Sequence, residues 1–96
     1  MKLRKNSRTL QQAFEQAIDK TRSLKQDTYI MLTPDRWILY GSTPNLGDTI
    51  LAKIQIDVSY DPDTYCRIER VVARLWRPAF GEEWLTKVAS MVDEVY

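Results

Sequence analysis

The sequence has 96 residues, of which 44% are hydrophobic and 28% are charged, and its formal net charge is +1. This length and composition predict one folded domain with a modest core, and they exclude a disordered or fibrous class. The small net charge argues against a uniformly basic nucleic-acid-binding protein.

The histidine and cysteine contents limit the chemistry and the location that we expect. The sequence contains no histidine, so the commonest general base and metal ligand near neutral pH is missing. Cys66 is the sole cysteine and no internal disulfide can form, which is typical of a reducing compartment. No apolar run reaches the roughly 18 to 20 residues of a membrane span, and the N-terminus lacks a secretory signal's apolar segment. We therefore expect a cytoplasmic protein with no membrane partner.

The N-terminus predicts a basic, flexible arm over residues 1–6, followed by a single domain over residues 7–96. Four cations at this end could contact phosphates: Lys2, Arg4, Lys5 and Arg8. Apolar residues then recur at the spacing of one helix face, namely Leu10, Ala13, Phe14, Ala17, Ile18 and Leu24. Because Thr9 and Gln12 have capping-box spacing, we predict a helix over about 8–24.

The middle of the chain predicts three β-strands. Residues 28–33 and 36–41 are rich in β-branched and aromatic residues, and Pro34 between them suits a tight turn, so they predict a hairpin. After a loop over 41–48, apolar and polar residues alternate from Ile50 to Ser59, which indicates a strand with one solvated face. We expect a three-stranded antiparallel sheet with helices packed on one side.

Residues 61–78 favour a second helix, with a strand as the alternative. Asp61 can cap a helix and Pro62 suits its first position. A helix over 65–76 would also separate its apolar residues from a stripe of four arginines: Arg67, Arg70, Arg74 and Arg77. The β-branched residues in this stretch are also compatible with a fourth, bulged strand. We favour the helix, and Pro78 ends the element in either case.

The C-terminal residues predict a last helix that begins at Glu82 and Glu83. Its apolar stripe comprises Trp84, Leu85, Val88, Val92 and Val95 and runs to the C-terminus. The predicted fold is therefore a small α+β domain with an N-terminal helix, a three-stranded antiparallel sheet and two C-terminal helices. The alternative is an αββββα order with residues 65–76 as the fourth strand.

The sequence contains no pattern that predicts catalysis, a cofactor site or a metal site. Asp57, Asp61 and Asp63 lack the glycine and the distal glutamate of a calcium loop, so we assign them to caps and turns. Cys66 has no histidine partner to activate its thiol, and we interpret it as a packing residue. We expect no enzymatic activity.

Surplus aromatic and arginine side chains predict a binding surface. Trp, Tyr and Arg are enriched at interface hot spots, and we expect partner contacts from Trp37, Tyr40 and Trp76 together with the arginine stripe. Our first hypothesis is an adaptor, inhibitor or regulator that binds an acidic protein surface, with self-association also possible. The alternative is a nucleic-acid-binding protein that uses the arginine stripe and the basic arm.

Overall fold

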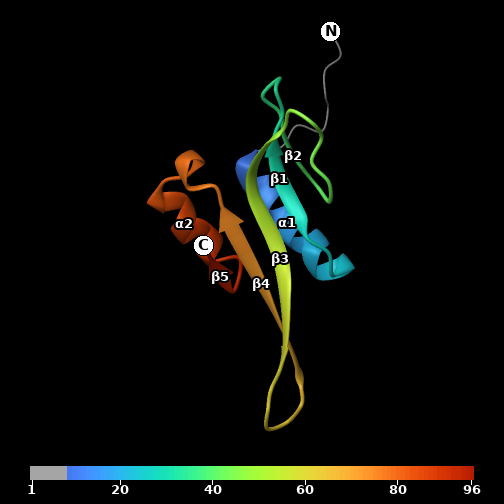
Figure 1. The fold of residues 1–96 in the computed structure, drawn as a ribbon. Helices are drawn as coiled ribbons and strands as arrows, with labels where there is room; N and C mark the ends of the chain where they lie inside the picture. Colours follow the sequence, from blue (N-terminus) through green and yellow to red (C-terminus); the bar gives the residue numbers. More distant parts are fainter. Residues whose placement is uncertain (1–8) are drawn as a thin grey trace.

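The computed structural model describes residues 9–96 (Figure 1). Within these residues, two α-helices, a short 3-10 helix and five strands occur in the order α1 (Leu10–Leu24), β1 (Thr28–Leu32), β2 (Ile38–Gly41), β3 (Thr49–Tyr60), β4 (Arg67–Leu75), η1 (Arg77–Ala79), α2 (Glu82–Ala89) and β5 (Glu94–Val95). The strands form one mixed sheet in the order β2-β1-β3-β4-β5, in which only the β4–β5 pair is parallel. The predicted α+β class is therefore confirmed, with more strands than the favoured three.

Helix α1 begins and ends as its sequence predicts. Thr9 caps it through a complete capping box, in which the Thr9 hydroxyl accepts from the Gln12 backbone and the Gln12 side chain accepts from the Thr9 backbone. Lys25 closes the helix in the left-handed conformation at φ 56°, and its N–H donates to the Thr21 carbonyl. The apolar stripe of α1 then faces the sheet.

The β1–β2 hairpin is closed by the predicted turn at Pro34. Arg36 N–H donates to the Thr33 carbonyl, and Arg36 adopts a φ of 72°, which lets the chain reverse within three residues. Thr33 N–H in turn donates to the Trp37 carbonyl. Strand β2 lies at the edge of the sheet, so the 42–48 loop must cross β1 to reach β3.

Residues 65–76 do not form the favoured helix, because Arg67–Leu75 is strand β4. It pairs with β3 in unbroken antiparallel register from Ala52↔Leu75 to Tyr60↔Arg67, so it also lacks the bulge of the alternative. The sheet's irregularity lies between β1 and β3, where Leu51 is an extra residue between two pairs.

The helix-start signal at Asp61 is used by a hairpin turn instead. Asp61 Oδ1 accepts from the backbone N–H groups of Asp63 and Thr64, as an N-cap would. Tyr65 then adopts a φ of 58°, and Asp61 N–H donates to the Cys66 carbonyl, which starts the β4 ladder. The same cap chemistry serves both structures, so it could not discriminate between them.

The last predicted helix is shorter than expected. Helix α2 ends at Ala89, and Glu94–Val95 forms β5 beside β4. Asp93 fixes this change of direction, since its N–H donates to the Val71 carbonyl and its carboxylate accepts from Val71 N–H. Val92 and Val95 remain packed against the core, so the apolar pattern predicts their burial correctly but not their conformation.

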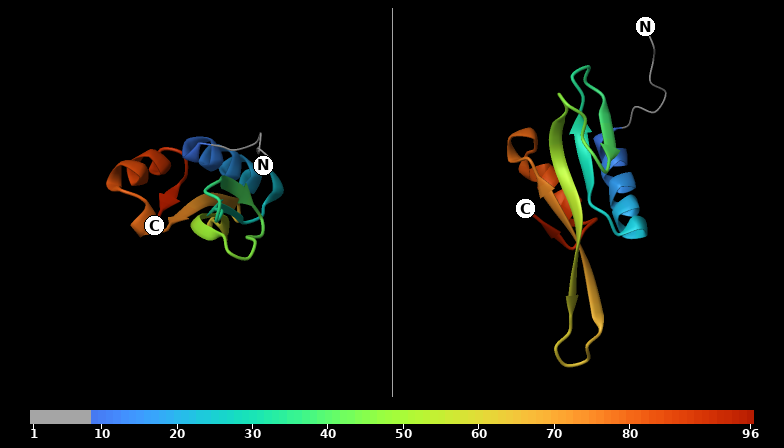
Figure 2. Two further views of the ribbon diagram at one scale, coloured as in Figure 1. Left: turned by 90° about the horizontal axis from the view of Figure 1, so that it is seen from above. Right: turned by 45° about the vertical axis from the view of Figure 1, so that its right-hand side comes forward.

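Both helices pack on one side of the sheet, as Figure 2 shows from above. Phe14 lies at the centre of this core and is fully buried, with the Phe80 and Trp84 rings 5.9 and 5.8 Å from it. Ile30, Ile54 and other alternating strand residues complete the core. We call this side of the sheet the back face and the side without helices the front face.

Strands β3 and β4 extend beyond the body as a two-stranded arm, which we define as residues 57–70 (Figures 1 and 2). All its residues are exposed except Asp61, which is half-buried. The arm explains why the Cα radius of gyration is 14.7 Å, above the about 12.5 Å typical of a compact chain of this length.

Candidate binding surface

Tyr29, Lys53 and Arg74 form a row across the centre of the front face. They are register partners on β1, β3 and β4, which places their side chains on one side of the sheet. The Lys53 Nζ lies 5.7 Å from the centroid of the Tyr29 ring. Three residues that are far apart in the sequence therefore create a row of aromatic and cationic groups.

Arg74 also stacks on the C-terminal Tyr96, with its guanidinium carbon 4.7 Å from the ring centroid. Backbone bonds hold Tyr96 beside β4, since its N–H donates to the Ala73 carbonyl and its carbonyl accepts from Leu75 N–H. Among residues 9–96, Arg74 takes part in no ion pair. Its N–H donors therefore remain available to a partner.

Below this row, Arg70 and Tyr96 converge on Glu94. Arg70 Nη2 lies 2.5 Å from Glu94 Oε2, and the Tyr96 hydroxyl donates to the other carboxylate oxygen. The Tyr96 hydrogen bond, with help from Arg70, lowers the pKa of Glu94 below its ordinary 4.5. The same bond raises the pKa of Tyr96 above 10.0. Glu94 thus neutralises Arg70 and positions the ring on which Arg74 stacks.

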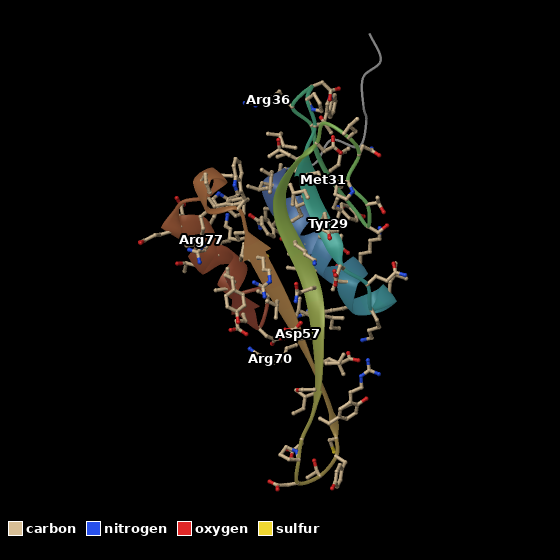
Figure 3. All side chains as sticks on the ribbon, viewed as in Figure 1. Tyr29, Met31, Arg36, Asp57, Arg70 and Arg77 are labelled. Carbon is tan, nitrogen blue, oxygen red and sulfur yellow. The ribbon has the colours of Figure 1, made fainter. Side chains whose placement is uncertain are left out.

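Apolar groups surround the upper part of the front face. Met31 points to this side, as Figure 3 shows, yet it is only 4% exposed, and the end of its side chain lies against Gly41 of β2. Ile50, the register partner of Met31, is 43% exposed. Trp76 directly follows β4 and is 49% exposed, and strand alternation places it on the same side as Arg74. We call Tyr29, Ile50, Lys53, Arg74, Trp76 and Tyr96 the front patch.

The structure separates the four arginines that the sequence grouped together. Arg70 and Arg74 share the front face, whereas Arg67 lies on the back side of the arm, 3.0 Å from Glu69. Arg77 belongs to η1 and lies beside α2 in Figure 3. The prediction that the four arginines share one face of a helix is therefore wrong. Arg74 belongs to the front patch, and Arg70 lies next to it on the same face.

The three predicted aromatic anchors also lie in different places. Tyr40 packs against the core beside α1, with Lys20 Nζ 5.8 Å from its ring centroid. Trp37 is half-buried at the end of the β1–β2 turn. Trp76 is the most exposed of the three. The predicted phosphate contacts Lys2, Arg4, Lys5 and Arg8 lie outside the described residues.

Sequence reasoning misses Tyr29, Lys53 and Tyr96 as members of a common surface. The alternation of its strand places Lys53 on a solvated face, but its neighbours depend on a strand order that periodicity does not reveal. The pairing of Val95 and Tyr96 with β4 is hidden because the last residues continue a helical apolar pattern.

Other sites in the described part of the chain are weaker candidates. Residues 9–96 contain no cluster of three or more His, Cys, Asp or Glu side chains that could hold a metal ion. A hollow of about 310 Å³ on the back side is lined by Glu15, Ile18, Asp19, Arg22 and Met91. It opens widely to solvent between α1 and the C-terminal segment. Within the same residues, no helix combines the length and apolarity needed to cross a membrane.

Comparisons with known proteins provide no family for this chain. No protein-family model matches it, and neither the curated proteins nor the solved structures include a significant match.

Proposed function

We propose that this protein is a non-enzymatic protein-binding module whose partner docks on the front patch. The observation that carries the proposal is a sheet face free of helices, where Trp76, Tyr96 and Ile50 are 49%, 45% and 43% exposed around Arg74. Both helices pack on the opposite face and cannot cover it (Figure 2). Trp, Tyr and Arg are the residue types that dominate interface hot spots, and here all three occur together.

The charges of this face indicate the chemistry of the partner. Arg70 is neutralised by Glu94 at 2.5 Å, and Lys53 lies 3.5 Å from Asp27. Arg74 stacks on Tyr96, takes part in no ion pair within residues 9–96, and so keeps its N–H donors for a carboxylate. We therefore propose a partner that presents an acidic side chain next to an apolar group, which would pack between Trp76 and Ile50.

The proposal is tested by affinity capture from a lysate of the source cells, with three variants. Trp76→Ala and Arg74→Gln each remove one element of the front patch. Leu24→Ala is the matched control, because Leu24 is 54% exposed but lies at the end of α1. We expect the front-patch variants to lose the captured protein and the control to retain it.

Titration of each variant with the captured protein then measures how far its affinity is reduced. We expect Trp76→Ala to weaken binding by about 30-fold, corresponding to about 2 kcal/mol for a hot-spot residue. Equal affinities for the wild type and both front-patch variants would refute docking on this surface. Thermal unfolding of each variant separates lost binding from lost structure.

A nucleic-acid ligand is the second candidate, and one observation favours it. Lys53 and Arg74 lie over Tyr29 and Tyr96 on an open sheet, and bases stack on such aromatic and guanidinium surfaces. Fluorescence anisotropy of labelled single- and double-stranded DNA and RNA at two salt concentrations tests this function. Tight, salt-sensitive binding that the Arg70→Gln/Arg74→Gln variant loses would favour it over a protein partner.

A further inference from the structure

The outer edge of the arm exposes backbone groups whose positions follow from the β3–β4 register. Asp61 N–H donates to the Cys66 carbonyl and Trp76 N–H donates to the Leu51 carbonyl, and both pairs belong to the same register. Backbone groups therefore face β3 at even-numbered residues of β4 and face outward at odd-numbered ones. The residues whose backbone N–H and C=O groups face outward are Arg67, Glu69, Val71, Ala73 and Leu75.

The C-terminal segment occupies only the upper part of this edge. Val71 bonds to Asp93, while Ala73 and Leu75 bond to Tyr96. Within residues 9–96, no backbone partner is present for the N–H and C=O groups of Arg67 and Glu69. The unoccupied edge thus lies on the arm (Figure 1), where Glu69 also contacts Lys25 at the end of α1.

The side chains of this short edge are complementary to a second copy of themselves. Arg67 and Glu69 lie two residues apart on one face, and Ile68 between them is 41% exposed on the other. If two arms pair antiparallel about a two-fold axis through Ile68, each Arg67 lies opposite the Glu69 of the second copy. Opposite charges then meet twice, and the two Ile68 side chains contact each other.

We propose that the β4 edge of the arm binds the same edge of a second copy, which makes the protein a dimer with a continuous four-stranded arm. The pairing satisfies the outward N–H and C=O groups of Arg67 and Glu69 in both copies, which form four N–H···O=C bonds. Edge strands are commonly protected by charged side chains that repel a neighbour. Here the charges alternate in sign, so antiparallel self-pairing converts them into attraction.

Two charge reversals provide a test in which a folded but monomeric variant can be rescued. In a dimer of Arg67→Glu, the introduced carboxylate would oppose the Glu69 carboxylate of the second copy. In a dimer of Glu69→Lys, the introduced ammonium would oppose the Arg67 guanidinium. Each variant alone should therefore be monomeric, because like charges meet at both ends of the pairing.

A heterodimer of the two variants has opposite charges at both positions of the pairing. At one position the introduced carboxylate faces the introduced ammonium, and at the other Arg67 faces Glu69. The mixture should therefore form a heterodimer. Lys25→Met is the matched control, because Lys25 binds Glu69 within one chain at 2.6 Å and is not part of the edge.

Sedimentation equilibrium from ~1 μM to ~1 mM covers the affinities of weak and moderate dimers. We expect a dimer for the wild type and Lys25→Met, monomers for each reversal, and a dimer for the mixture. Hydrogen exchange should slow at the amides of Arg67 and Glu69 as concentration rises, and remain unchanged at Val58 on the other edge of the arm. A wild-type monomer throughout, or a dimer that both reversals retain, would overturn the proposal.

Discussion

Phe14 joins the helices to the sheet and contributes most to the core as a single side chain. It is fully buried between Phe80 and Trp84, and their rings contact it at edge-to-face and stacked angles. Phe14→Ala should lower the free energy of unfolding by about 3–5 kcal/mol, because it removes a buried ring and leaves a cavity. Urea denaturation measures this loss.

The control on the same helix is Leu24→Ala, whose side chain is 54% exposed. It should change the free energy of unfolding by no more than about 0.5 kcal/mol. Comparable losses in the two variants would contradict the position of α1 on the back face.

The pKa of Glu69 should show whether the arm contacts Lys25 at the end of α1. Its hydrogen bond to Lys25, together with the charges of Lys25 and Arg67, lowers its pKa below the ordinary 4.5. A carboxylate with a lowered folded-state pKa stabilises the folded state above 4.5 and loses this contribution as pH falls through the folded pKa. An NMR titration of the Glu69 side chain should therefore give a value below 4.5.

Lys25→Met removes the principal cause of this lowering. The pKa of Glu69 should rise in the variant, and the stability of the variant should fall less steeply than that of the wild type as the solution is acidified below pH 4.5. An unchanged pKa would show that Lys25 does not contact Glu69 in solution.

At the level of residues, the sequence predicts apolar burial better than polar burial. Helical spacing alone assigns Phe14, Ala17 and Ile18 to the core face of α1, and all three are buried. The buried hydrogen bond between the hydroxyls of Thr21 and Thr28, 2.9 Å long, is not predicted. Such a pair forms only when α1 folds back onto β1, and neither residue shows this in its local pattern.

At the level of elements, the arm should be separable from the body. In the first variant, an Asn-Gly turn between Ser59 and Ile68 replaces residues 60–67. Ser59 and Ile68 remain register partners on β3 and β4. Residues 60–67 contribute no buried side chain, so the free energy of unfolding should change by less than about 1 kcal/mol. Thermal and urea unfolding measure the change.

A deeper truncation is the matched comparison. Joining Gln55 to Val72 by the same turn also removes Val71, which is 3% exposed and binds Asp93. This variant should lose at least about 2 kcal/mol, because it removes a core side chain and the bonds that position β5. If the shorter truncation destabilised the protein as much, the arm would be part of the cooperative fold.

The element that sequence reasoning places in the wrong class is β4. Alternation along this strand puts Arg70 and Arg74 on the same face as Val72, which is fully buried despite facing the front. A helix separates arginines from apolar residues and is therefore more consistent with the local sequence. The sheet resolves the conflict because Val72 lies between its register partners Gln55 on β3 and Glu94 on β5, an arrangement that only tertiary structure supplies.

At the level of the whole molecule, the structure places two different surfaces at two ends. The front patch lies beside the C-terminus on the body, whereas the Arg67–Glu69 edge lies on the projecting arm (Figures 1 and 3). If both proposals hold, a dimer would carry two front patches and would bind a multivalent partner more tightly than a monomer. Glu69→Lys should then weaken capture on a dense surface without changing the affinity for a single partner molecule in solution.

The surface as a whole is the least predictable feature of the sequence. Tyr29, Lys53, Arg74 and Tyr96 come from four strands or strand ends, and their proximity follows from the order β2-β1-β3-β4-β5. That order requires the 42–48 loop to cross β1, and no local sequence signal shows that it does. The preference for protein contact still rests on residue types that the sequence shows: exposed aromatic groups and arginine.

Oxidative footprinting of the protein bound to its captured partner tests whether the partner docks on the front patch. Docking on the front patch should reduce labelling of Trp76 and Tyr96, while Tyr65 at the arm tip, which is 82% exposed, should be labelled as strongly as in the free protein. Full labelling of Trp76 and Tyr96 in the complex would contradict the account, because the partner would then bind elsewhere.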